Sequence, residues 1–193
     1  MPDLAALSNL DGMRCELIRH PDFPCDAVDG IAVEVERPDR DRLVLRYAAT
    51  GEIRRLVLPR PAAPDRTDDL WRRTCFEAFV RPLEGASYLE FNLSPSTQWA
   101  AYRFEGYRYR SEPASVRPPR IEMNKGSDRV ELTAALDLSP ELPQHAAWRV
   151  GLSAVIEETD GRLSYWALAH PPGRPEFHPA DCFAAELPAP DRP

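Results

Sequence analysis

The stretch 74–104, TCFEAFVRPLEGASYLEFNLSPSTQWAAYRF, alternates or runs apolar in short segments that stop at proline or glycine. Residues 74–81 and 87–94 are two such segments, joined through 82–86. Gly85 gives this connection the backbone freedom that a tight turn needs. Period-two alternation in segments of this length is typical of strands, so the stretch predicts an antiparallel hairpin followed by a third strand.

The rest of the chain has the same character, with short runs that end at Pro, Gly or Asp. Helical periodicity is confined to residues 4–10 and to a single turn at 137–142. About eleven short strands with turn signals between them predict an all-β fold, a two-sheet antiparallel β-sandwich of jelly-roll or immunoglobulin-like type. The predicted strands are 13–18, 31–37, 42–48, 53–58, 74–81, 87–94, 99–104, 129–135, 148–157, 163–169 and 182–187.

The chain has 193 residues, which suits one domain with a sizeable core. No repeat, low-complexity tract or shift in composition divides it. We predict a single domain over 1–193, with its core at about 13–188 and a frayed tail at 189–193. Proline-rich segments cannot pair in the centre of a sheet, and long loops in compact domains often carry function. Such loops are predicted at 59–69, 105–120 and 170–181.

The formal net charge of −7 argues against a nucleic-acid groove and against binding to an anionic membrane surface. Lys125 is the only lysine beside many arginines, a bias typical of GC-rich bacterial genomes. No apolar run is long enough to span a bilayer. The start of the chain, MPDLAALSNLDG, has neither the basic residues nor the apolar core of a secretory signal. We therefore expect a bacterial, cytoplasmic protein.

The cysteines and the short motifs exclude several kinds of site. Cys15, Cys25, Cys75 and Cys182 form no CxxC pair, which argues against a structural zinc site and, in a reducing cytosol, against disulfides. The sequence contains no GxSxG, no P-loop, no GxGxxG after a strand and no HExxH. These absences set aside the corresponding hydrolases, nucleotide-binding enzymes and metalloproteases.

Polar side chains share one face of the predicted hairpin. Alternation in 87–94 places Tyr88, Glu90 and Asn92 together, and Glu77 lies near the middle of the partner strand. This face is either a solvated sheet surface or a binding face, on which carboxylates accept hydrogen bonds from sugar hydroxyls. If Glu77 and Glu90 were opposite each other, their spacing near 5 Å would also allow an acid–base pair for glycoside hydrolysis. Small sandwiches without a deep cleft are seldom glycosidases, so we do not expect an enzyme.

Two tryptophans are candidates for ligand binding. Trp71 lies in the polar stretch Asp-Leu-Trp-Arg-Arg, beside Arg72, which predicts partial exposure of the indole. An exposed indole can stack on a sugar ring while neighbouring polar groups bind the hydroxyls. Trp166 alternates with both polar and apolar neighbours, so its side of the sheet is ambiguous, whereas Trp148 is expected in the core.

The loop 170–181 carries His170 and His178, with Glu176 and Asp181 nearby. Two imidazoles and a carboxylate could hold a metal ion. Alternatively, proline-flanked histidines close a loop by hydrogen bonds to backbone carbonyls. The spacing alone fixes no geometry, and both interpretations stay open.

A resemblance to a known family rests on the order of several short motifs. The order of Leu70-Trp71, Cys75–Phe79, Tyr88–Asn92 and Trp99 resembles the DOMON-like and family 9 carbohydrate-binding-module superfamily. The closing pattern, Ser164–Leu168, His170-Pro171, Pro175–His178 and Cys182-Phe183, is similar to the stand-alone bacterial branch of the DOMON-like group. Together these motifs cover about 28–188.

The resemblance implies an antiparallel β-sandwich that binds a ligand on one face or edge. In the carbohydrate-binding relatives two tryptophans clamp a sugar; Trp71 matches one of them, and Trp166 matches the other less closely. Glu77, Glu90 and Asn92 match the acidic and polar strand positions. Other relatives bind haem between a methionine and a histidine, and the internal methionines of this chain lie in no segment that matches them.

The sequence therefore predicts a non-catalytic module that binds a saccharide-like small molecule. One alternative is a haem- or metal-binding protein, with calcium possible, that uses His170 or His178. Another is an enzyme of unassigned class with Glu77 or Glu90 as general base. The sheet face and the loops 105–120 and 170–181 compete as the binding surface, the former loop with Tyr107 and Tyr109. The predicted ligand-binding residues are Trp71, Arg72, Glu77, Glu90, Asn92 and Trp166.

Overall fold

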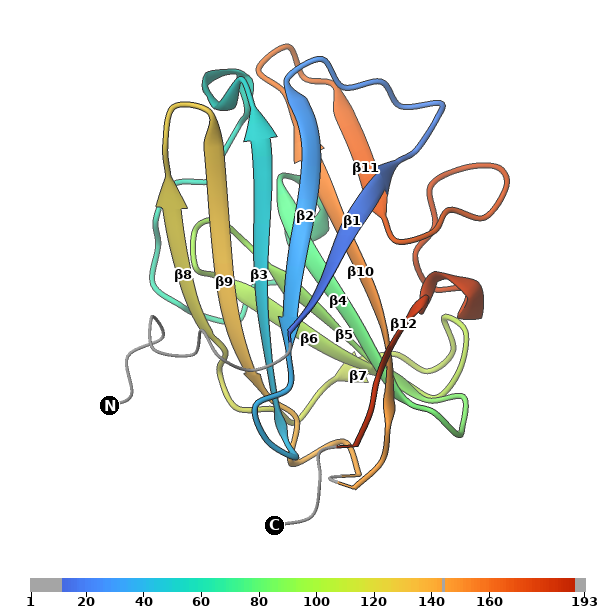
Figure 1. The fold of residues 1–193 in the computed structure, drawn as a ribbon. Helices are drawn as coiled ribbons and strands as arrows, with labels where there is room; N and C mark the ends of the chain where they lie inside the picture. The colour runs from blue at the N-terminus through green and yellow to red at the C-terminus, as the bar shows by residue number, and fades with distance from the viewer. Residues whose placement is uncertain (1–11, 144, 190–193) are drawn as a thin grey trace.

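The computed structural model describes residues 12–143 and 145–189. Strands dominate this part of the chain, with only short 3-10 helices besides, and all strand pairs are antiparallel, so the all-β prediction is confirmed (Figure 1). The helix expected at 4–10 lies outside the described residues. The elements are β1 (Met13–Arg19), β2 (Val28–Glu36), β3 (Arg42–Gly51), η2 (Ile53–Arg55), η3 (Leu70–Arg72), β4 (Cys75–Pro82), β5 (Tyr88–Leu93), β6 (Trp99–Phe104), β7 (Glu112–Pro113), β8 (Arg120–Lys125), β9 (Arg129–Asp137), β10 (Trp148–Glu157), β11 (Leu163–Ala167), η4 (Ala180–Cys182) and β12 (Ala185–Leu187).

The strands form one hydrogen-bonded sheet that curls on itself, where two separate sheets were expected. Its order is β7-β6-β5-β4-β10-β11-β1-β2-β3-β9-β8, and β12 pairs with β10 beside the end of β11. The two halves of the sheet are joined by the short pairing of Ile18 and Arg19 in β1 with Ala167 and Trp166 in β11. Figure 1 shows the half that contains β2, β3, β8 and β9 in front of the half that contains β4, β5, β6 and β10.

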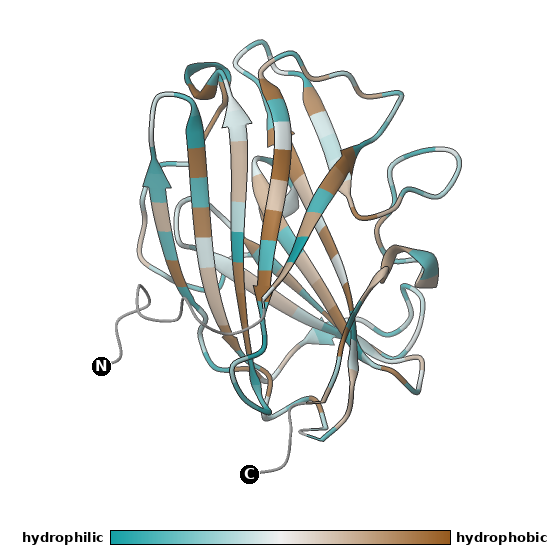
Figure 2. Ribbon diagram, in the orientation of Figure 1, coloured by the Kyte–Doolittle hydropathy of each residue, from teal (hydrophilic) through white to brown (hydrophobic). Residues whose placement is uncertain are grey.

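The core lies between these halves because alternate side chains of each strand point inward. Apolar and polar residues alternate along β9, and its buried positions alternate in step (Figure 2). Tyr47 of β3, fully buried, donates a hydrogen bond of 2.6 Å from its hydroxyl to the backbone oxygen of Glu77 in β4. This bond fixes one half of the sheet against the other. Trp148 is buried as expected, with the Arg37 guanidinium 3.4 Å from its ring centroid.

Three expected elements differ from the structure. The strand predicted at 53–58 is replaced by η2, because Ile53 reaches the core through a helical turn. The loop predicted at 105–120 contains β7, and the strand β8 that follows was not predicted, because this edge strand buries little and is mostly polar. The strand predicted at 182–187 begins only at Ala185, after η4. Within the described residues no helix has the length and apolarity to cross a bilayer.

Candidate functional site

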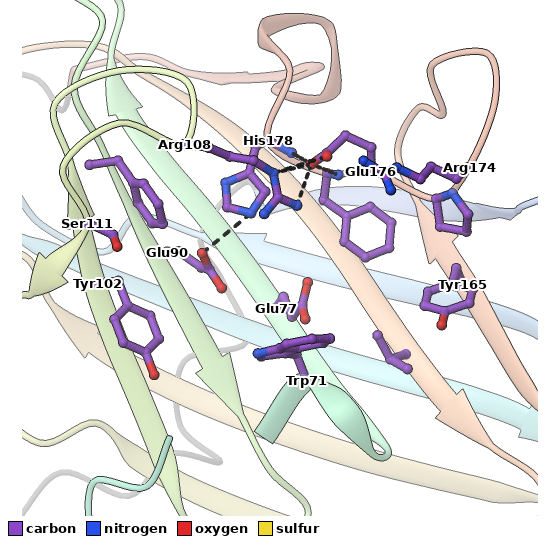
Figure 3. Close-up of a pocket in the computed structure, with 14 residues that line it drawn as sticks. Trp71, Glu77, Glu90, Tyr102, Arg108, Ser111, Tyr165, Arg174, Glu176 and His178 are labelled. Atoms are coloured by element: carbon purple, nitrogen blue, oxygen red, sulfur yellow. Dashed lines mark hydrogen bonds and ion pairs between the residues drawn. The ribbon is translucent and has the colours of Figure 1, made fainter. Parts of the chain in front are cut away.

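A cavity of about 540 Å³ lies over the outer face of strands β4, β5, β6, β10 and β11 (Figure 3). The strands supply its base, η3 supplies one side, and the loops β6–β7 and β11–β12 supply the others. Among the described residues the lining is made by Trp71, Glu77, Glu90, Tyr102, Phe104, Arg108, Ser111, Val155, Tyr165, Arg174, Pro175, Glu176, Phe177 and His178.

The base of the cavity follows from the alternation of the hairpin. Leu89, Phe91 and Leu93 point into the core, so Glu90 and Asn92 point to the opposite face, as predicted. The register places Glu77 opposite Asn92, and Glu90 opposite Phe79 on one side. The two glutamates are therefore diagonal neighbours, not the directly opposed pair considered from the sequence. Diagonal Cα atoms on paired strands are about 7–8 Å apart, not about 5 Å.

Both carboxyl groups are buried, which excludes a plain solvated sheet face. Glu77 is 3% exposed and accepts a hydrogen bond of 2.9 Å from the Ser153 hydroxyl, and Glu90 is 7% exposed and accepts one of 2.7 Å from the Asn92 amide. Burial, and secondarily the charge of Glu90, raises the pKa of Glu77. Burial likewise raises the pKa of Glu90, although the Asn92 bond and Arg108 oppose this rise. Asn92 is buried behind Glu90 and supports it without lining the cavity.

Trp71 stands at the side of the cavity on the single turn of η3, next to Glu77 (Figure 3). Its side chain is 48% exposed, as the polar sequence around it predicted. Asp69, with φ of 62°, turns the chain into η3 just before it. Arg72 does not line the cavity: its guanidinium lies 5.3 Å from the Trp71 ring centroid and 3.3 Å from the Asp69 carboxylate.

The two long loops meet across the cavity through Arg108 and Glu176. Arg108, with φ of 49°, donates from Nη2 to Glu176 Oε1 at 3.0 Å and from Nε to Oε2 at 3.1 Å. The Glu176 carboxylate also accepts hydrogen bonds from the backbone N–H groups of Phe177 and His178. Partial burial alone would raise the pKa of Glu176, but the bonds from Arg108 and His178 lower it, so this group is an anion. The sheet face and both loops thus form one cavity, where the sequence presented them as competing surfaces.

His178 is packed inside the site rather than free to bind a metal ion. Its Nδ1 lies 2.8 Å from the Tyr88 hydroxyl, which also accepts a bond of 3.2 Å from the Arg108 backbone N–H. Its Nε2 lies 3.7 Å from Glu90 Oε2. Burial lowers the pKa of His178 to about 4, which keeps the ring neutral near neutral pH.

His170 lies outside this cavity and joins the loop to β1. Its Nε2 donates to the Ile18 backbone oxygen at 2.7 Å, while His20 Nε2 bonds to the Gly173 oxygen at 2.9 Å. The two rings are in edge contact, with centroids 5.0 Å apart. His170 therefore closes the loop through a backbone carbonyl, as one interpretation of the sequence proposed for His170 and His178, whereas His178 bonds to the Tyr88 hydroxyl instead. Among the described residues no group of three or more His, Cys, Asp or Glu is placed to hold a metal ion.

Trp166 belongs to the core and does not line the cavity. It is 4% exposed, and its Nε1 donates a hydrogen bond of 3.0 Å to the Ser164 hydroxyl. That bond explains why Ser164, a polar residue, lies on the core face of β11. The presence of this serine made the side of Trp166 ambiguous in the sequence.

Sequence reasoning missed several cavity residues. Tyr102, cross-strand partner of Glu90, donates from its hydroxyl to Asp68 Oδ1 at 2.5 Å. Arg108 stands between Tyr107 and Tyr109, which drew attention in the sequence but are exposed and outside the lining. The only hint of Arg108 in the sequence was its place in the long loop 105–120, because long loops often carry function. Tyr102 could have been found by extending the polar face of the hairpin to the third strand.

Comparisons with known proteins identify the fold. The chain superposes with a TM-score of 0.65 on the crystal structure of a "putative carbohydrate-binding protein" from Bacteroides uniformis, at 14% identity over 88% of this chain and 83% of that chain. The two proteins share a fold. A family 9 carbohydrate-binding module from Caldicellulosiruptor kristjanssonii, in complex with cellotriose, matches with a TM-score of 0.49 at 12% identity, over 82% of this chain and 75% of that chain. No family model and no curated protein matches the sequence.

Proposed function

We propose that this chain is a non-catalytic binding protein for a saccharide-like small molecule, held in the cavity between η3, the sheet face and the two loops. The observation that carries the proposal is a half-exposed indole, Trp71, beside the buried carboxyl groups of Glu77 and Glu90. The cavity volume of about 540 Å³ is in the range of small-molecule sites.

Each part of the lining has a role that suits a sugar. The flat face of Trp71 can stack on the apolar face of a pyranose ring. The carboxyl oxygens of Glu77 and Glu90 can accept hydrogen bonds from the sugar hydroxyls, and Arg108 can donate hydrogen bonds to the hydroxyl oxygens. Ser153 and Asn92 hold the two glutamates in place before a ligand arrives, which reduces the ordering cost of binding.

Two further observations are consistent with this assignment. The Bacteroides uniformis protein of the same fold is named for carbohydrate binding. The order of the sequence motifs also resembles the DOMON-like group. We favour its sugar-binding members over its haem-binding members for two reasons: carboxylates line the cavity, and His178 is hydrogen-bonded to Tyr88. In the cytoplasmic location that we propose, the ligands would be soluble sugars or nucleotide sugars.

Thermal-shift and calorimetric titrations with mono- and oligosaccharides and nucleotide sugars test the proposal. A ligand at a hundred times its Kd stabilises by about 2.7 kcal/mol, which is roughly 5–10 °C for a domain of this size. Trp71→Ala should abolish the shift while leaving the melting temperature of the free protein nearly unchanged. Leu83→Ala is the matched control, because Leu83 is similarly exposed, at 42%, but lies outside the cavity lining. Unchanged affinity in Trp71→Ala would remove the indole from the site.

A second candidate, glycoside hydrolysis, is favoured by the burial and raised pKa values of Glu77 and Glu90 within a cavity. A hydrolytic pair, however, needs one carboxyl protonated as acid and the other ionised as base or nucleophile. Both pKa values are raised in the same direction, so neither carboxyl group is singled out as the acid, and the half-exposed Trp71 keeps binding as our first proposal. Release of reducing ends from oligosaccharides, lost in Glu77→Gln, would reverse this preference.

A further inference from the structure

Glu77 and Glu90 form a buried acidic pair that makes no ion pair with an arginine or lysine in the described part of the chain. Among the described residues, neither carboxylate has such a cation within ion-pair distance, and their hydrogen-bond donors, Ser153 and Asn92, are uncharged. His178 approaches Glu90 to 3.7 Å, but its lowered pKa leaves it neutral near neutral pH. Two carboxyl groups buried to this extent are costly without a counter-charge.

Neither arginine of the cavity makes an ion pair with these carboxylates, although the charge of Arg108 opposes the rise of both pKa values. Arg108 directs its guanidinium at Glu176, with which it makes a paired contact. Arg174 stands on the β11–β12 loop, at the other end of the cavity from Glu90 (Figure 3). The space beside Glu77 and Glu90 is therefore acidic even though the whole lining contains both signs of charge.

Aromatic rings line the same cavity. Trp71, Tyr102, Tyr165 and Phe177 all line the cavity, and Figure 3 shows Trp71 directly beside Glu77. The faces of such rings attract cations, most strongly those of tryptophan, and aromatic rings combined with a carboxylate are suited to an ammonium group. A neutral sugar would use the hydrogen-bond acceptors of this space but would leave its charge unbalanced.

We propose that the saccharide-like ligand of this cavity is an amino sugar, whose protonated amine binds between the carboxylates of Glu77 and Glu90 beside the Trp71 ring. This inference rests on the proposed function and names the class of sugar that the site prefers. The ring of the sugar stacks on Trp71, and its ammonium group donates hydrogen bonds to the free carboxylate oxygens.

Proton release provides a signature of this binding mode. Without ligand, burial raises the pKa values of both glutamates, and the charge of Glu90 adds to the rise at Glu77, whose pKa of about 8 lets it retain a proton near neutral pH. An ammonium ion favours the ionised carboxylates, so its binding lowers both pKa values and expels protons to the buffer. The other titratable or charged groups that face the pair or its strands are Tyr47, Cys75, Tyr88, Tyr102, Arg108, Tyr165, Arg174, Glu176 and His178.

The test is calorimetric titration of the whole chain with D-glucosamine, N-acetyl-D-glucosamine and D-glucose near neutral pH, in two buffers of different ionisation enthalpy. These sugars share one ring and differ only in one substituent, which is a charged ammonium in glucosamine, a neutral acetamide in N-acetylglucosamine and a hydroxyl in glucose. We expect glucosamine to bind roughly tenfold more tightly than the other two, the difference between a charged and a neutral hydrogen bond. We also expect proton release with glucosamine alone.

Glu77→Gln and Glu90→Gln keep the shape of each side chain and remove its charge. In each single variant we expect the preference for glucosamine to fall severalfold and the proton release to disappear. Glu84→Gln is the matched control, because Glu84 is an exposed glutamate on the turn between the same two strands. If one glutamine variant fails to fold, the other and the proton count for the unaltered protein still decide.

The outcomes separate this inference from the proposed function. Binding of glucose or N-acetylglucosamine as tightly as glucosamine would overturn the amino-sugar assignment and leave saccharide binding in place. A preference for glucosamine that persists in both glutamine variants would also overturn it. No binding of any of the three, together with no response in the wider sugar panel, would overturn both.

Discussion

Arg108 and Glu176 connect loops that are far apart in the sequence, and their ion pair, with Nη2 3.0 Å from Oε1, forms one border of the cavity. The Arg108 side chain is 54% exposed and that of Glu176 is 14% exposed. The pair therefore belongs to the surface on one side and to the binding site on the other. Because of this position, we expect the ion pair to contribute little to stability but to matter for ligand binding.

Arg108→Gln should weaken ligand binding with little effect on stability. An exposed ion pair contributes at most about 1 kcal/mol to the free energy of unfolding. The ligand, however, loses a charged donor and an ordered loop, which should reduce affinity roughly tenfold. Calorimetry and urea denaturation measure the two effects. Arg110→Gln, which removes the exposed pair of Arg110 with Glu105, should change neither, and an equal loss of affinity there would refute a specific role for Arg108.

Glu77→Gln should stabilise the protein, and the gain should grow with pH. The folded pKa of Glu77 is raised above its ordinary value of 4.5, so the folded state binds more protons than the unfolded state between these two values. The contribution of Glu77 to stability therefore falls as the pH rises through this window. The difference in unfolding free energy between Glu77→Gln and the unaltered protein, measured from about pH 5 to about pH 8, should increase steadily. A difference that stays constant with pH would contradict the raised pKa.

Tyr88→Phe should destabilise the fold and disorder the cavity wall. The Tyr88 hydroxyl accepts from the Arg108 backbone N–H and bonds to His178, and neither group has another partner at these atoms among the described residues. Loss of these buried bonds should cost about 1–3 kcal/mol in urea denaturation. Tyr165→Phe is the control, since the Tyr165 hydroxyl makes no hydrogen bond in the described part of the chain. Equal stability of the two variants would show that the Tyr88 hydroxyl does not hold the wall.

His170→Leu should loosen the β11–β12 loop without removing any cavity side chain. The variant loses the bond to the Ile18 oxygen, and we expect faster hydrogen exchange over 171–178 together with a loss of about 1 kcal/mol. Burial, aided by His20, lowers the folded pKa of His170, so its stabilising contribution is complete above about pH 6.5 and is lost as the pH falls. Acidification should therefore reduce the stabilising contribution of His170 and speed hydrogen exchange in the same loop. Unchanged exchange in the loop would show that other contacts anchor it.

Local patterns predicted the parts of the site that depend on local geometry. Alternation along single strands placed Glu77 and Glu90 on one face, and the polar neighbours of Trp71 predicted its exposure. Both properties are determined within a few residues of the chain. The hairpin turn at 82–86 was likewise predicted from its residues.

The remaining parts depend on contacts between distant segments. Arg108 and Glu176 meet only because two loops close over the same sheet face, and no sequence spacing encodes that meeting. The register that makes Glu77 and Glu90 diagonal depends on the exact turn between their strands. Continuity of the sheet depends on the pairing of Arg19 with Trp166, which is too short to leave a pattern in the sequence.

The pairing of β12 with β10, which joins Trp148 to Leu187, has a consequence for synthesis on the ribosome. The strands that carry Glu77 and Glu90 emerge early, whereas the loop with Glu176 and His178 is held at its far end by Phe183, which packs against Phe79, and by β12. In a nascent chain that has not yet released Leu187, we expect this loop to be held less firmly over the face that carries the two glutamates. A translation product that stops before β12 should therefore bind its ligand more weakly than the whole chain.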